Sequence, residues 1–168
     1  MKRLILTVLM IAATASAAFA QKYMVVDSEK IFKSIDEYNT AIKNLDALAA
    51  QYQKTVDDKF AAVETLYNNY MAQKASMPQS TRTVREREIL EQEKAATEYQ
   101  ESVFGADGII MKKRIEAIQP IQTRVFGAIE KFAGEHGYDL VIDIASNAAV
   151  LYYAPSANHT DDIINLLK

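Results

Sequence analysis

Residues 34–77 read SIDEYNTAIKNLDALAAQYQKTVDDKFAAVETLYNNYMAQKASM, with no internal Gly or Pro. Apolar side chains recur along this stretch at steps of three and four, which keeps them on one face of a helix. Residues 34–37 match the S-x-x-E capping box that begins many helices. The pattern predicts one helix from Asp36 to Met77, about 60 Å long at about 1.5 Å per residue. A rod of that length exceeds a compact domain, so we expect it to project from a body. The stripe consists of Ile42, Leu45, Leu48, Ala49, Tyr52, Val56, Phe60, Val63, Tyr67, Tyr70 and Met71.

A return helix is predicted after Pro78, because proline cannot continue the first helix and Ser80 and Thr81 can cap the next one. The short connection favours an antiparallel hairpin. We therefore expect a helical arm over residues 36–119, with its tip near 77–81. Gly105 and Gly108 interrupt the return helix and predict either a kink or hinge at 105–108 or a local bulge without a mechanical role.

The segments on either side of the arm predict a small β-containing body, so the fold class is α+β. Residues 21–35 suit a strand at 23–26 and a short helix at 28–33. Residues 120–168 suit the end of the return helix, a β-hairpin of residues 138–144 and 149–153, and a final helix with Thr160 as its N-cap.

Three short strands per chain would form a sheet that is apolar on both faces and open at both edges. Copies of the chain can complete such a sheet, since closed symmetric assembly removes the open edges. We expect a homotrimer, or else a dimer, formed through the strands. The predicted interface comprises Met24, Val25, Val26, Leu140, Val141, Ile142, Ile144, Val150, Leu151 and Tyr152.

The first 20 residues have the features of a secretory signal peptide. Lys2 and Arg3 precede a short apolar run, and Ala18-Phe19-Ala20 matches a cleavage site, so the mature chain is predicted to begin at Gln21. The remainder carries 17 basic and 22 acidic residues, a formal charge of −5, which argues against a nucleic-acid partner.

The residue inventory offers little for catalysis. The chain has no Cys, which excludes thiol catalysis and cysteine-based metal sites, and it has no phosphate-binding loop or hydrolase motif. His136 precedes Gly137 and suits a cation at a helix end, while His159 is expected on the surface. We predict no enzyme activity, no catalytic residue, no metal and no cofactor.

Three segments in order carry a family resemblance. They are MVVDSEKIF at 24–32, the long helical hairpin, and GYDLVID at 137–143 followed by LYY at 151–153. Together they resemble the Skp/OmpH family of periplasmic chaperones. The resemblance implies a homotrimer with a β-barrel body, whose three arms enclose a cavity for unfolded outer-membrane proteins and work without ATP.

The acidic charge departs from the best-known members, which are strongly basic, and argues against contact with lipopolysaccharide or anionic membranes. An alternative function is a structural or adaptor coiled coil of the cell envelope that binds a folded partner. Aromatic and Met residues on the arm can either close the seam between the helices or contact clients. Near the tip, Tyr70, Met71 and Met77 are spread around the helix, and we expect these three to contact clients.

Overall fold

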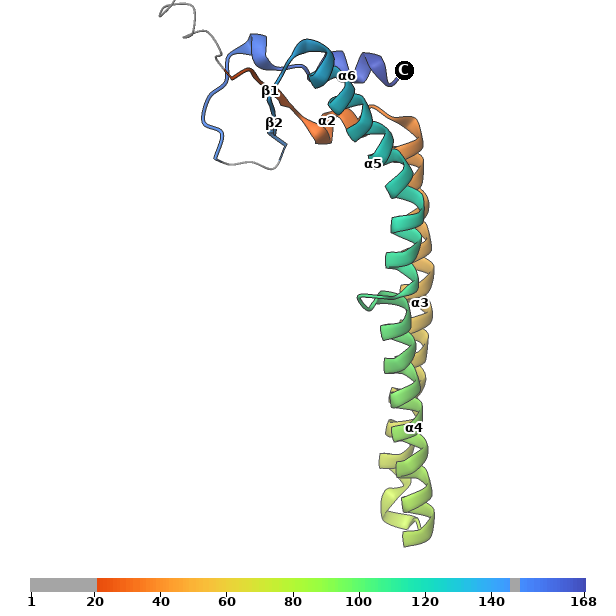
Figure 1. Cartoon of the computed structure of the whole chain (residues 1–168). Helices are drawn as coiled ribbons and strands as arrows, with labels where there is room; N and C mark the ends of the chain where they lie inside the picture. The colour runs from red at the N-terminus through yellow and green to blue at the C-terminus, as the bar shows by residue number, and fades with distance from the viewer. Residues whose placement is uncertain (1–20, 146–148) are drawn as a thin grey trace, which may run out of the picture. The chain divides into compact units, whose positions relative to one another are not determined.

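The computed structural model describes residues 21–145 and 149–168; the predicted signal peptide lies outside them. Contacts divide the chain into two units, which we call the arm, Asp36–Gln122, and the body, formed by residues before 36 and after 122. The elements appear in Figure 1. In chain order they are β1 (Tyr23–Val26), α2 (Ser28–Lys33), α3 (Asp36–Gln73), the 3-10 helix η1 (Lys74–Ser76), α4 (Gln79–Phe104), α5 (Ile109–His136), β2 (Leu140–Asp143), the 3-10 helix η2 (Pro155–Ala157) and α6 (Thr160–Leu166).

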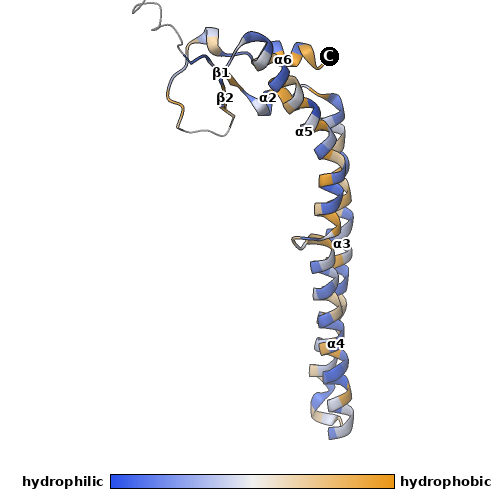
Figure 2. Cartoon of the chain, viewed as in Figure 1, coloured by the Kyte–Doolittle hydropathy of each residue, from blue (hydrophilic) through white to orange (hydrophobic). Residues whose placement is uncertain are grey.

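The arm is a helical hairpin, as the spacing of apolar residues predicts. Its first helix ends at Gln73, four residues earlier than predicted, because the chain tightens into η1 before the extended Met77 and Pro78. The seam between α3 and α4 closes over few side chains: Val56 is 1 % exposed, Ala96 2 % and Val103 0 %. Hydrophobic and hydrophilic residues alternate along all three long helices (Figure 2). Since so little of the arm is buried, its stability depends strongly on each seam residue.

The body contains a parallel pair of strands, which corrects the predicted β-hairpin. β1 pairs with β2 in the register Tyr23↔Leu140 to Val26↔Asp143. Residues 149–153 form no strand in the structure, so a third strand is not confirmed. Asn158 forms an isolated parallel β-bridge with Val25. The backbone N–H of His159 donates to the Val25 carbonyl oxygen at 3.0 Å. β1 is therefore the central segment of the body, and β2 is its edge.

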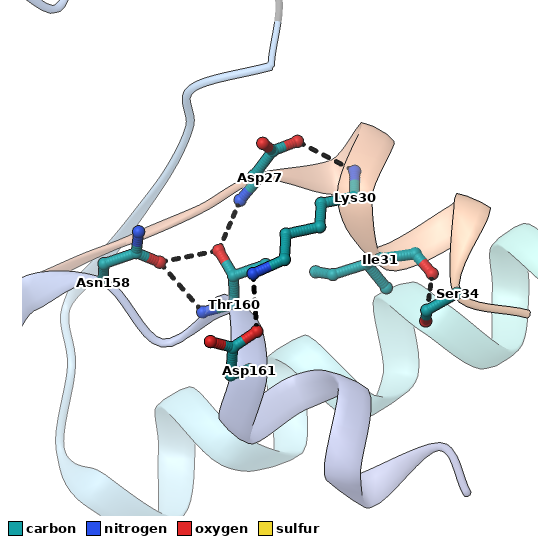
Figure 3. Close-up of polar contacts among 7 residues, drawn as sticks. All are labelled: Asp27, Lys30, Ile31, Ser34, Asn158, Thr160 and Asp161. Atoms are coloured by element: carbon teal, nitrogen blue, oxygen red, sulfur yellow. Dashed lines mark hydrogen bonds and ion pairs between the residues drawn. The ribbon is translucent and has the colours of Figure 1, made fainter.

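Thr160 ties the last helix to the end of β1 in a way that the N-cap prediction missed. Its hydroxyl accepts a hydrogen bond from the backbone N–H of Asp27 at 2.9 Å and donates to Asn158 Oδ1 at 2.6 Å (Figure 3). The N-cap of α6 is His159, not Thr160. Asp27 in turn caps α2, since its side chain accepts from the Lys30 N–H. One hydroxyl thus links the starts of two helices from opposite ends of the chain.

His159 is a body residue with defined partners, and the predicted surface role is wrong. Its side chain is 16 % exposed, its Nδ1 lies 2.8 Å from Asp162 Oδ2, and its Nε2 lies 2.7 Å from the Tyr138 hydroxyl. Because a carboxylate only accepts, Nδ1 donates to Asp162, and Nε2 makes the contact with the Tyr138 hydroxyl. The ring also contacts Phe132, with centroids 5.2 Å apart. These contacts join the end of α5, the start of β2 and α6.

His136 lies in the last turn of α5, as predicted. Its Nδ1 is 2.8 Å from the carbonyl oxygen of Phe132, one turn earlier, and the ring donates to it because a carbonyl oxygen only accepts. Gly137 follows with φ of 68°, the left-handed conformation that a glycine adopts without strain. The two residues end the helix and turn the chain toward β2.

Asp143 fixes the end of β2 to the start of α2. Its carboxylate accepts from the Ser28 hydroxyl at 2.6 Å, the Ser28 N–H at 3.1 Å and the Ala145 N–H at 3.0 Å. Burial acts to raise the pKa of Asp143, but these hydrogen bonds from Ser28 and Ala145 outweigh it, and the pKa lies below its ordinary value. Because the pKa is lower in the folded state, the carboxylate stabilises the fold above its unfolded pKa, and this contribution is lost as pH falls through the folded pKa.

Replacing Asp143 by Asn is therefore expected to lower the free energy of unfolding at pH 7 by about 0.5–1 kcal/mol, a figure reduced by solvent screening. The gap between wild type and variant should narrow as pH falls below about 4. Urea unfolding at several pH values measures it, with the exposed Asp46→Asn on α3 as a control. A gap that stays constant down to about pH 2 would contradict this account of the carboxylate.

Candidate functional site

The body presents an apolar surface around β2, which we call the edge surface. Met24, Val25 and Val26 of β1 are buried, whereas Leu140 on β2 is 56 % exposed. Further along the chain, Leu151 is 94 % exposed and Tyr152 83 % exposed. Tyr152, Tyr23 and Leu140 line one hollow of about 560 Å³ beside the strands. Side chains of this size and exposure at a strand edge are typical of a surface that another chain covers.

The ten residues predicted at the interface between copies divide into two groups. Met24, Val25 and Val26 are 0–2 % exposed, so they belong to the core of this chain and are not available to a partner. The remaining seven lie on or next to the edge surface: Leu140, Leu151 and Tyr152 are exposed, and Val141, Ile142, Ile144 and Val150 are half-buried.

The three predicted client contacts on the arm also differ in position. Tyr70 is 5 % exposed, and its hydroxyl donates to the Glu86 carboxylate of α4, so it belongs to the seam and not to an open surface. That hydrogen bond, together with burial, raises the pKa of the Tyr70 hydroxyl. Met77 is half-buried and lines a small pocket with Tyr70. Met71 alone of the three is openly exposed, at 49 %.

Three exposed apolar side chains lie on one face of α3, and the sequence predicts an open surface role for only one of them, Met71. Phe60 is 36 % exposed and Tyr67 50 %, and with Met71 they fall at steps of seven and four along the helix. That spacing places the three on one face. We call this set the arm stripe. The spacing of three and four does not separate buried seam residues from exposed ones. The apolar face of the helix is wider than the seam, so some of its apolar positions lie outside the contact with the facing helix.

The return helix breaks at the predicted glycines, between Phe104 and Ile109. The geometry requires both: a Cβ on Gly105 would lie 2.5 Å from the Glu101 carbonyl oxygen, and one on Gly108 would lie 2.4 Å from that of Val103. Gly108 N–H donates to the Gly105 carbonyl at 2.9 Å, so the loop is a closed turn. Whether it acts as a hinge stays a prediction.

Gly108→Ala is expected to destabilise the arm by about 1–3 kcal/mol, because the added Cβ forces the backbone out of the turn. Gly127→Ala is the matched control: its Cβ would meet nothing within 4 Å inside α5, and alanine favours a helix. Thermal unfolding followed by circular dichroism should therefore move in opposite directions for the two variants. Equal melting temperatures for them would show that the turn carries no steric requirement.

Within residues 21–145 and 149–168, no helix has both the length and the apolar character needed to cross a membrane. In the same part of the chain, no group of three or more His, Asp or Glu side chains is arranged to hold a metal ion.

Comparisons with known proteins agree with this arrangement. The family model described as "Outer membrane protein (OmpH-like)" matches residues 22–167. Chaperone protein Skp of Yersinia enterocolitica is 28 % identical over 161 residues, covering 95 % of this chain and 93 % of that protein. Chaperone protein Skp of Pectobacterium atrosepticum is 28 % identical over 165 residues, with the same coverage. Because the family model spans nearly the whole described chain, in the order of strand, helical hairpin, strand and helix, the chain belongs to the OmpH-like (Skp/OmpH) family.

Proposed function

We propose that this protein is a periplasmic holdase chaperone, which binds unfolded outer-membrane proteins without ATP and prevents their aggregation. The observation that carries the proposal is the arm: a long hairpin that buries few of its own side chains and leaves Phe60, Tyr67 and Met71 exposed on one face. An unfolded chain offers apolar segments without fixed shape, and exposed aromatic and Met side chains suit such varied partners.

The proposal includes self-assembly, as a homotrimer. The edge surface supports it, because Leu151 and Tyr152 are too exposed for residues with no partner. Assembly would bring several arms around one client, so that a weak contact on each arm adds to the others.

Export is part of the same proposal, with the signal peptide cleaved after Ala20, and mass spectrometry of the exported protein tests the cleavage site.

The function is tested by diluting a urea-denatured outer-membrane β-barrel protein into buffer with the mature chain and no nucleotide, and following light scattering. Suppression of the scattering is the expected result. A variant with Phe60→Ser, Tyr67→Ser and Met71→Ser should lose most of it, whereas Leu166→Ser, which alters a 53 % exposed residue of the body, should not. Absence of suppression by the wild type at molar excess would refute the holdase function.

The second candidate, an adaptor that binds a folded partner through its arm, predicts a different outcome. An adaptor would leave unrelated unfolded chains unprotected in the same assay. The exposed stripe on α3 is compatible with either function, and the β-barrel assay separates them.

A further inference from the structure

The part of the arm formed by α3 and α5 is more open than the part formed by α3 and α4. α3 and α4 approach each other at many positions, whereas α3 and α5 do so at few. Between the latter two helices lies a groove of about 750 Å³. Its residues run from Asp36 to Leu48 on α3, about 18 Å along the helix axis. The groove is long enough for about three turns of helix or about five residues of extended chain.

The floor of this groove, which we call the basal groove, is apolar. Ala41, Leu45, Leu48 and Ala117 line it, and all four are half-buried. In the α3–α4 seam, by contrast, Val56 and Val103 are fully covered. Leucine side chains on the inward stripe of a hairpin normally meet the facing helix, so their partial exposure here leaves apolar area that a bound segment would cover.

The rim of the groove is acidic. Asp36 and Glu37 come from the first turn of α3, and Glu116 comes from α5. The one cation among the lining residues is Lys113, whose Nζ lies 2.8 Å from Glu116 Oε2. The hydrogen bond and charge of Lys113 lower the pKa of Glu116, so that both are charged at neutral pH. The residues that line the groove thus include three carboxylates and one ammonium group.

A helix dipole alone does not account for this rim. Acidic residues are favoured in a helix's first turn, which explains Asp36 and Glu37, but Glu116 lies well inside α5, where the dipole gives no such preference. Carboxylates from two helices thus face the same apolar floor. A ligand that matches both features is a segment with apolar side chains on one side and Lys or Arg on the other.

We propose that the basal groove binds basic amphipathic segments of client proteins. This inference rests on the proposed chaperone function and names the chemical class of client segment that the chain prefers. Such a segment would place its apolar side chains on Leu45 and Leu48, while its cations lie near the carboxylates of Asp36 and Glu116.

The test measures binding of two fluorescent peptides of about 18 residues to the mature chain by anisotropy. Both carry the same leucine stripe at helical spacing, one with Lys on its polar face and the other with Glu. The Lys peptide should bind at least about tenfold more tightly, and the preference should shrink between about 50 mM and about 300 mM salt.

Two charge-matched double variants locate the site. Asp36→Asn with Glu116→Gln removes two rim carboxylates and should weaken binding of the Lys peptide about five- to tenfold. Glu91→Gln with Glu93→Gln changes the net charge equally on exposed positions of α4 and should leave binding within about twofold. Leu45→Gln removes apolar floor and should weaken binding without changing the charge.

Equal weakening by the two double variants would show that net charge attracts the peptide and would overturn the groove as its site. Equal binding of the Lys and Glu peptides would overturn the preference for basic segments. The β-barrel aggregation assay is run on the same samples. If wild type suppresses aggregation but shows no peptide preference, the inference alone fails; if it shows no suppression, the chaperone function fails.

Discussion

Replacing both Leu151 and Tyr152 by Asp is expected to disrupt the proposed homotrimer and to give monomers that stay folded. These side chains are 94 % and 83 % exposed in the single chain, so the substitutions remove almost no contact within it. In an assembly they would be buried, and burial of each apolar side chain contributes about 1.5–3 kcal/mol. Two carboxylates placed there instead must be desolvated without partners, which costs several kcal/mol more. The change recurs in every copy, so the effect on assembly is multiplied.

The molar mass from light scattering measures this outcome, and circular dichroism verifies that the fold persists. Leu166→Asp provides the control, since this residue of α6 is also exposed, at 53 %, but is absent from the proposed interface. A double variant that keeps the wild-type mass would place the contact between copies elsewhere. If the monomer forms yet suppresses aggregation as well per chain as wild type, clients are not held between several arms.

The arm is the part of the fold that the sequence predicts best, because its signals are local. Steps of three and four set the helices, Pro78 sets the turn, and each of these depends on neighbouring residues only. The need for Gly105 and Gly108 is also local, because a Cβ at either position would clash with a backbone carbonyl oxygen four or five residues earlier. Local signals did not distinguish Tyr70 from Tyr67, however. Both fit the same period, and only the position of α4 decides which is covered.

The body is predicted less well, because its pairings are distant in sequence. β1 and β2 are joined by the entire arm, and nothing in either four-residue run specifies a parallel partner. The β-forming residues 149–153 suggest a strand paired with 138–144. In the structure, residues 140–143 pair with β1 instead, and 149–153 form no strand. His159 and Thr160 were misjudged for the same reason. Tyr138 and the Asp27 N–H reach them only after the chain has folded.

Replacing Val56 by Asp is expected to open the arm while the body stays folded. Val56 is 1 % exposed in a seam with few other fully buried side chains, so one unpaired carboxylate there should cost about 3–5 kcal/mol. Amide hydrogen exchange in α3 and α4 should accelerate at least about a hundredfold, and exchange in β1 should stay unchanged.

Ala62→Asp, an exposed position six residues further along α3, is the control and should leave exchange in the arm as in wild type. Since the stripe of Phe60, Tyr67 and Met71 requires an intact helix to face one way, the Val56 variant should also lose suppression of aggregation. Undiminished protection of α3 in that variant would mean that something other than the seam, such as contact with other copies, holds the arm together.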